Sequence, residues 1–284
     1  MKYLVSAGII CTMFASTAAM SATSLSSEAT AASAKITAAS AVQANVTVAK
    51  ASGSTPGNYN NTSTLANVNQ NFMLVDGILV DAYQSLKANV ISSQAYSNTP
   101  GNVSATGTTQ ITNAESKLYT TLFGIPTLSL GITADAIGST TTVGANSGGL
   151  FATGNATFTN LALSGSLFDA LNLNANLLFN PGPNTVVLAL SGLTGISLIL
   201  NEQIMTGNGT DTLGMTTNAV HLSFKDYLFE GKLLNGDVIL GQSKALISGY
   251  SPAVPEPGTW AMMIAGFALV GSAMRRRKTN VQFA

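Results

Sequence analysis

The chain has 284 residues, enough for one large domain or two small ones with a substantial core. Only 8% of the residues are charged, against about 25% in an ordinary soluble domain, while the hydrophobic content of 46% is ordinary. Between residues 23 and 252 there are eleven carboxylates, seven lysines and no arginine, a formal charge of about −4. Such a surface cannot follow a phosphate backbone by charge, so nucleic-acid partners are excluded and an extracellular, β-rich protein is favoured.

The N-terminus has the organisation of a signal peptide over residues 1–22. Lys2 provides a short positive region, "YLVSAGIICTMFA" an apolar region, and "STAAMSA" the small residues that a signal peptidase requires. Cleavage is expected after Ala19 or Ala22. An uncleaved membrane anchor is the alternative, but the apolar run is short. The only cysteine, Cys11, lies in this segment, so the mature protein is expected to contain no disulfide and no cysteine metal ligand.

Residues 23–39 are rich in Ala, Ser and Thr and are expected to form a flexible leader. The passenger domain is expected over residues 40–250, where apolar residues recur with a period of two from Val42 onward. Alternating or β-rich segments follow at residues 171–177, 185–190, 196–200, 219–224 and 237–241, separated by Gly, Pro and Asn turn signals. Many short strands of this kind predict a mostly β fold, an antiparallel β-sandwich or barrel.

The hydrophobic pattern of residues 71–96 does not distinguish a helix from strands. Their apolar residues lie near helical spacing, but the segment is also enriched in Val and Ile, and Asp76-Gly77 is a hairpin signal. A helix and a pair of strands both remain open, and we favour the strands.

The C-terminal segment, residues 251–284, predicts a transmembrane helix over residues 259–274 followed by a basic cluster over residues 275–278. The uncharged run of residues 260–274 spans about 22 Å as a helix, less than the ≈ 30 Å hydrocarbon core. The long basic side chains can reach the far headgroups, and Trp260 suits the near interface. Because basic residues mark the cytoplasmic side, the cluster predicts a stop signal with the passenger outside.

This tail resembles the PEP-CTERM sorting signal of Gram-negative bacteria that make exopolysaccharide, and in particular its PEP-x-x-W-A subclass. The resemblance rests on the order of motif, apolar helix and basic cluster, with the motif at Pro255, Glu256, Pro257, Trp260 and Ala261. It implies recognition by exosortase, a membrane enzyme that cuts near the motif. It also implies membrane retention by Arg275, Arg276, Arg277 and Lys278.

The passenger resembles the choice-of-anchor P family of exported bacterial proteins. The phrases that carry the resemblance are "STPGNYNNTSTLANV", "NPGPNTVVLAL", "ISLILNEQIMTGNGT", "TTNAVHLSF" and "LLNGDVILGQSKA". This family has no established activity to transfer, so the resemblance implies no functional residue in the passenger.

The passenger shows no sequence pattern for catalysis, a cofactor or a metal. His221, the only histidine, is expected on the polar face of a strand, and no second histidine or cysteine completes a zinc site. A nucleophile-elbow motif for a Ser-His-Asp triad is lacking. The segment "TGNGTD" at residues 206–211 is expected to be a polar hairpin loop rather than a calcium site. A glycosidase needs two facing carboxyl groups, and no motif singles out a pair among Asp76, Asp81, Asp135, Asp169, Glu202, Asp211, Asp226, Glu230 and Asp237.

We therefore expect an exported, noncatalytic protein of the cell surface or exopolysaccharide matrix, sorted by an exosortase-like enzyme. Its expected partners are that enzyme, the membrane through the C-terminal helix, and exopolysaccharide or further copies of itself. The alternatives are a secreted hydrolase of matrix polysaccharide and a type I membrane protein that is never cut.

Overall fold

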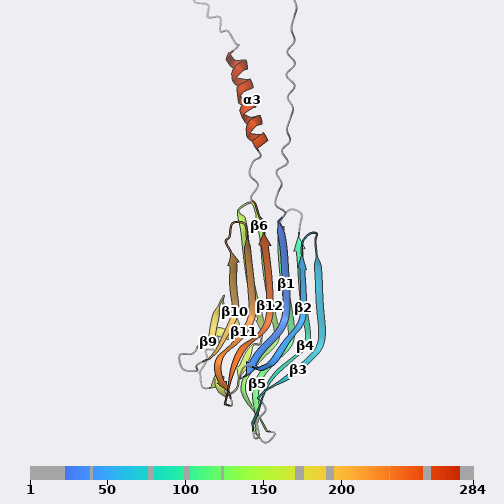
Figure 1. Ribbon diagram of the computed structural model, residues 1–284, viewed down its shortest axis with the longest axis vertical. Coiled ribbons are helices and arrows are strands. Elements are labelled where there is room, and N and C mark those ends of the chain that lie inside the picture. The colour runs from blue at the N-terminus through green and yellow to red at the C-terminus, as the bar shows by residue number, and fades with distance from the viewer. Residues whose placement is uncertain are drawn as a thin grey trace, which may run out of the picture. The chain divides into compact units, whose positions relative to one another are not determined.

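The computed structural model describes residues 23–38, 41–75, 80–98, 103–122, 125–169, 176–189, 195–229, 231–251 and 257–275 (Figure 1). The chain divides into two compact units between Tyr250 and Ser251. The first unit consists mainly of two antiparallel β-sheets, and the described part of the second is one helix, α3 (Pro257–Arg275).

Six strands form the first sheet: β1 (Ser24–Ala38), β2 (Ala41–Ser54), β9 (Thr185–Ala189), β10 (Ile196–Gly207), β11 (Leu213–Phe229) and β12 (Lys232–Ser248). Their spatial order is β2-β1-β12-β11-β10-β9. The first and last strands of the passenger are therefore neighbours, and they pair from Ser24 opposite Ser248 to Ala38 opposite Leu234.

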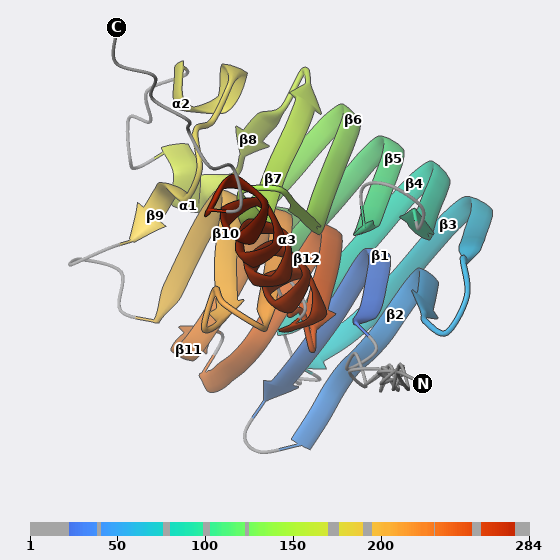
Figure 2. The same cartoon turned by 90° about the horizontal axis from the view of Figure 1, so that it is seen from above.

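The second sheet contains β3 (Asn60–Val75), β4 (Val80–Asn98), β5 (Val103–Leu122), β6 (Ile125–Asn146) and β7 (Gly149–Thr159) in chain order. A short strand, β8 (Ala162–Ser164), also pairs with β6. Two helices of one turn each follow it, α1 (Ser166–Asp169) and α2 (Asn176–Phe179). The two sheets pack face to face and form a sandwich (Figure 2), which confirms the expected mostly β fold with antiparallel sheets.

Most of the expected strands are present. The segments at residues 196–200, 219–224 and 237–241 lie within β10, β11 and β12, which are all longer than the patterns that revealed them. Residues 185–189 form β9. In the ambiguous segment 71–96 the strands are confirmed, because β3 and β4 pair antiparallel up to Val75 opposite Ala82. The predicted turn at Asp76-Gly77 lies outside the described residues.

Two predictions were wrong. The expected flexible leader is β1, which lies between β2 and β12. Its small residues do pack, because the sheets approach closely here: a Cβ on Gly107 of β5 would lie 2.6 Å from the carbonyl oxygen of Glu28 in β1. The alanines Ala29, Ala31, Ala32, Ala34 and Ala38 of β1 are therefore buried. The expected strand at residues 171–177 is contradicted at its end, where Asn176 begins α2; the residues before it are outside the described part of the chain.

The long strands share an irregularity at one level of each sheet. In β5 the buried hydrophobic residues are odd-numbered up to Ile111 and even-numbered from Ala114. The same three-residue step separates Ala134 from Ile137 in β6. In β1 the buried series changes from odd to even numbers between Ala31 and Ala32, and Thr30 is buried there as well. One residue inserted in a strand sends all later side chains to the opposite face. Because neighbouring strands shift at the same level, the inner faces of both sheets remain buried throughout.

Left-handed residues lie in this row on every second strand or, for Asn160, directly after the end of β7. In the first sheet they are Ala49 (φ 48°), Gly241 (φ 67°) and Asn201 (φ 51°), and in the second Asn67 (φ 55°), Asn113 (φ 50°) and Asn160 (φ 50°). Asparagine tolerates this conformation better than other residues with a Cβ. We call this feature the kink row.

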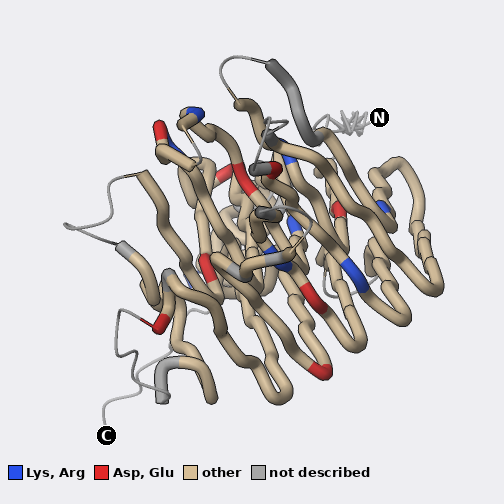
Figure 3. Tube along the Cα trace, turned by 90° about the horizontal axis from the view of Figure 1, so that it is seen from below, with Lys and Arg blue, Asp and Glu red and all other residues tan. Residues whose placement is uncertain are grey.

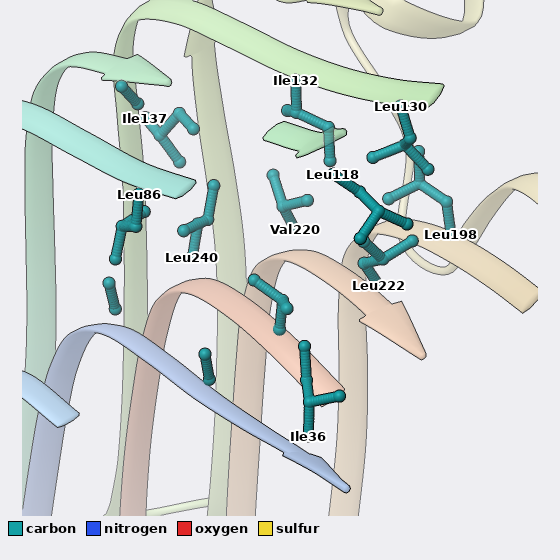
Figure 4. Packing of buried hydrophobic residues seen from close by; sticks show 14 of the residues in the cluster. Ile36, Leu86, Leu118, Leu130, Ile132, Ile137, Leu198, Val220, Leu222 and Leu240 are labelled. Carbon is teal, nitrogen blue, oxygen red and sulfur yellow. The ribbon is translucent and has the colours of Figure 1, made fainter. Parts of the chain in front are cut away.

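The interior of the sandwich has two apolar clusters. The larger contains Leu118, Leu130 and Leu222 (Figure 4), and the smaller lies towards the opposite ends of the strands, around Leu25 and Ile247. Five buried hydroxyl side chains separate the clusters and form what we call the hydroxyl layer: Thr109, Ser139, Thr141, Thr217 and Ser243.

The hydroxyl layer joins the two sheets by hydrogen bonds. The Thr141 hydroxyl donates to the Thr217 hydroxyl over 2.7 Å, and the Ser139 hydroxyl donates to the Ser243 hydroxyl over 3.0 Å. Buried hydroxyl groups are costly unless paired, so these bonds fix how one sheet sits on the other.

Valine is expected to lower the stability of the fold when it replaces a left-handed residue of the kink row. Asn113→Val places a β-branched side chain at φ 50° and is expected to lower the free energy of unfolding by about 1–2 kcal/mol in urea denaturation. Asn113→Gly is expected to lose less than about 1 kcal/mol, since glycine accepts this conformation.

Asn89 is the matched control, an exposed asparagine on β4 beside the kink row whose φ is not positive. Asn89→Val is expected to leave stability nearly unchanged. Equal losses for the two valine variants would contradict the role given to the left-handed backbone.

Candidate functional site

The second unit carries the predicted sorting tail. The predicted helix over residues 259–274 is present as α3, slightly longer than expected, and Pro257 stands at its first residue, where a missing N–H costs nothing. Large apolar side chains are exposed along it, including Met262, Phe267 and Leu269 at 70%, 70% and 72%. Within the described residues no helix, α3 included, reaches the length and hydropathy expected of a membrane span.

The structure places part of the predicted sorting motif and basic cluster. Pro257, Trp260 and Ala261 belong to the first turns of α3, and Arg275 is its last residue. The other predicted sorting residues lie outside the described part of the chain: Pro255, Glu256, Arg276, Arg277 and Lys278.

On the outer face of the first sheet, His221 of β11 lies between two carboxylates. Its Nδ1 is 2.8 Å from Oε2 of Glu202 in β10, and its Nε2 is 2.9 Å from Oδ1 of Asp237 in β12. The Asn218 amide also donates to Oε2 of Glu202, over 2.6 Å, and the Gln242 amide donates to Asn218 over 2.8 Å. These hydrogen bonds form what we call the His221 network, which links the side chains of three adjacent strands, β10, β11 and β12.

Both carboxylates favour the protonated imidazole, since a carboxylate can only accept hydrogen bonds from it. The hydrogen bond to Glu202 is the main cause that raises the pKa of His221, against the opposing effect of burial. The same hydrogen bond is the main cause that lowers the pKa of Glu202. When the imidazole is protonated, both ring nitrogens donate to carboxylates and no lone pair remains with which it could act as a base. The sequence placed His221 on a polar face, but only the register brings Glu202 and Asp237 to it.

Several other predicted carboxylates are held in separate local contacts. Asp135 accepts a hydrogen bond from Asn160 over 2.6 Å, and Asp226 accepts one from Asn235 over 3.0 Å. Asp76 and Glu230 lie outside the described residues. Among the surface hollows of the described residues, one contains Glu28 and another contains Glu115, each as its single carboxylate.

Residues 206–211 cover the end of β10 and most of its connection to β11. The side-chain carbonyl of Asn208 accepts hydrogen bonds from the backbone N–H groups of Thr210, Asp211 and Thr212, over 3.0–3.2 Å. The oxygen is thus engaged by the loop's own backbone. In the described ranges no group of His, Cys, Asp and Glu side chains is arranged to hold a metal ion.

Charged groups are sparse on the described sandwich, as Figure 3 shows. A hollow of about 300 Å³ on the outer face of the second sheet is surrounded by hydroxyl and amide groups instead. Gly138 keeps it open, because a Cβ there would lie 2.6 Å from Oγ1 of Thr157. The polar side chains that line this neutral hollow are Ser92, Gln94, Thr108, Gln110, Thr140, Asn155 and Thr157. It can offer hydrogen bonds to an uncharged, hydroxyl-rich ligand.

Comparison with known protein families matches residues 253–278 to the PEP-CTERM protein-sorting motif. No curated protein and no solved structure matches the chain. A motif of this kind implies an exported protein that an exosortase sorts at the membrane. The match confirms the resemblance of the tail; its subclass and the likeness of the passenger to choice-of-anchor P proteins stay predictions.

The His221 network predicts how stability depends on pH. The raised pKa of His221 means that its contribution is complete below about pH 6.5, the unfolded value, and is lost as pH rises through the higher folded pKa. The lowered pKa of Glu202 means that its contribution is present above about pH 4.3 and is lost as pH falls through the lower folded pKa.

The free energy of unfolding is therefore expected to fall above pH 6.5 in the native protein and to lose that dependence in His221→Gln. Because His221 is the only histidine, its imidazole resonance in NMR measures the folded pKa directly. A folded pKa at or below 6.5 would contradict the assignment.

Proposed function

We propose that this chain is a noncatalytic component of the cell surface or exopolysaccharide matrix. The observation that carries the proposal is the sorting motif at residues 253–278, which implies export. The passenger attached to it has few charges, and its neutral hollow offers hydroxyl and amide groups. Such groups suit hydrogen bonding to glycans or to further copies of the chain.

The proposal includes a route to the surface. Residues 1–22 act as a cleaved signal peptide and direct the passenger out of the cytoplasm. The apolar helix α3 then enters the membrane, with Arg275, Arg276, Arg277 and Lys278 on the cytoplasmic side, in the type I orientation. An exosortase-like enzyme recognises the PEP-x-x-W-A residues and cuts near them, which frees the passenger from α3.

Catalysis is left out of the proposal. A glycosidase requires two carboxyl groups across one cleft. The carboxylates of the His221 network are both engaged with the imidazole, and the described hollows hold carboxylates singly. These contacts favour a binding or structural role.

Tail processing is tested by intact mass spectrometry of protein from the medium and from the membranes of the source organism. The native protein in the medium is expected to lack about 20 N-terminal and about 25–30 C-terminal residues. The double variant Glu256→Ala, Pro257→Ala is expected to accumulate in the membrane fraction with its tail intact, because the motif is destroyed.

Pro252→Ala, one residue before the matched segment, is the control and is expected to be processed normally. Native protein whose tail stays intact in both fractions would make the tail an ordinary anchor and end the sorting proposal.

The matrix role is tested with processed protein and exopolysaccharide purified from the source organism. Co-sedimentation with the polysaccharide, or concentration-dependent self-association in analytical ultracentrifugation, is the expected result. A processed protein that shows neither behaviour would contradict the matrix proposal while leaving the sorting result in place.

A further inference from the structure

A second hollow, of about 600 Å³, lies on the outer face of the second sheet, on the other side of the kink row from the neutral hollow. It differs from that hollow in having an aromatic ring and charged groups. We call it the tyrosine–lysine groove, and its lining residues are Asn69, Asn71, Ser85, Lys87, Glu115, Lys117 and Tyr119.

The strand register arranges these residues in rows across β3, β4 and β5. Tyr83 lies opposite Tyr119 in the first row, Ser85 opposite Lys117 in the second, and Lys87 opposite Glu115 in the third. Rows on one face of a strand are about 6.6 Å apart, and neighbouring strands are about 4.8 Å apart. The groove therefore has the dimensions of one or two sugar rings.

The Tyr119 ring is held in place before any ligand arrives. It stacks on Tyr83 with ring centroids 5.4 Å apart and an interplanar angle of 19°. Its hydroxyl donates to Oδ1 of Asn71 over 3.2 Å. A fixed aromatic ring presents a large apolar face at low entropic cost. The apolar C–H face of a sugar is a suitable partner for such a ring, while Asn69 and Ser85 offer groups for its hydroxyls.

The charged groups of the groove leave an excess of positive charge. Lys117 and Lys87 both pair with Glu115, at 2.7 Å and 3.5 Å, so two ammonium groups share one carboxylate. Their side chains are 33% and 53% exposed. The hydrogen bond from Lys117 is the first cause that lowers the pKa of Glu115, so this carboxylate is ionised at neutral pH. The groove can therefore accept one further carboxylate from a ligand.

We propose that the tyrosine–lysine groove binds an acidic polysaccharide, with a uronic acid residue between Lys87 and Lys117 and an adjoining sugar ring on Tyr119. This inference rests on the proposed matrix function and names its ligand class and its site. Glu115 holds the two lysines in position and competes with the carboxylate of the ligand.

The test measures binding of the protein, in the form processed by its own host, to exopolysaccharide purified from the source organism. The polysaccharide is used in its native form and after chemical reduction of its carboxyl groups, which keeps the linkages and removes the charge. The native form is expected to bind about tenfold more tightly, the size of one charge-assisted contact. Added salt is expected to reduce this difference.

Three variants identify the groove. Tyr119→Ala and the double variant Lys87→Gln, Lys117→Gln are each expected to weaken binding of the native polysaccharide about tenfold or more. Glu115→Gln is expected to strengthen it, because the competing carboxylate is gone. Loss of structure alone cannot produce that gain.

Lys244→Gln is the control. It removes a lysine that pairs with Glu28 on the first sheet, away from the groove. This variant is expected to bind as the native protein does.

The outcomes separate the two proposals. Equal binding of the native and reduced polysaccharides, or unchanged binding in Tyr119→Ala and in the lysine variant, overturns the groove and leaves the matrix function standing. A protein that binds neither polysaccharide overturns the groove and removes glycan binding from the proposed function.

Discussion

The fold depends on one constraint: a residue inserted into a strand must be matched in the strands beside it. A single insertion reverses the inside and outside of everything that follows. Here the strands shift together at the kink row, so strands of up to 22 residues remain buried on one face along their whole length. The kink row also divides the outer face of the second sheet. On β5 it separates Gln110, in the neutral hollow, from Glu115, in the tyrosine–lysine groove.

Small uncharged residues account both for the close packing of the two sheets and for the low charge of the sandwich. Gly107 and the alanines of β1 allow the sheets to approach where larger side chains would separate them. The hydroxyl layer then supplies hydrogen bonds between the sheets in place of bulky apolar contacts. The few charged groups are used locally, as in the His221 network and around Glu115, rather than spread over the surface.

The sequence was sufficient for the fold class and for β2 and β9–β12, because strands such as β10 and β11 alternate clearly between apolar and polar residues, but it indicated none of β5–β8. It failed at β1, where alanine and serine were taken as too small to form a core. The alanines of β1 are buried because the other sheet comes close to this strand, as at Gly107, about 80 residues away in sequence. The kink row could not be predicted from the sequence, because Asn113, whose φ is positive, and Asn89, whose φ is not, are the same residue type. The sorting tail was recognisable because its motif, helix and basic cluster are contiguous. The His221 network and the stacked Tyr83 and Tyr119 were not, because strand register alone brings their members together.

The pairing of β1 with β12 sets the order of events during export. A chain that crosses the membrane from its N-terminus delivers β1 first, yet one edge of β1 has no partner until β12 has emerged more than 200 residues later. Contacts of such long sequence separation form slowly. During this interval β1 is an uncovered strand, prone to pair with the wrong partner. The first sheet can therefore be completed only after the last strand of the passenger is available, whichever strands pair first.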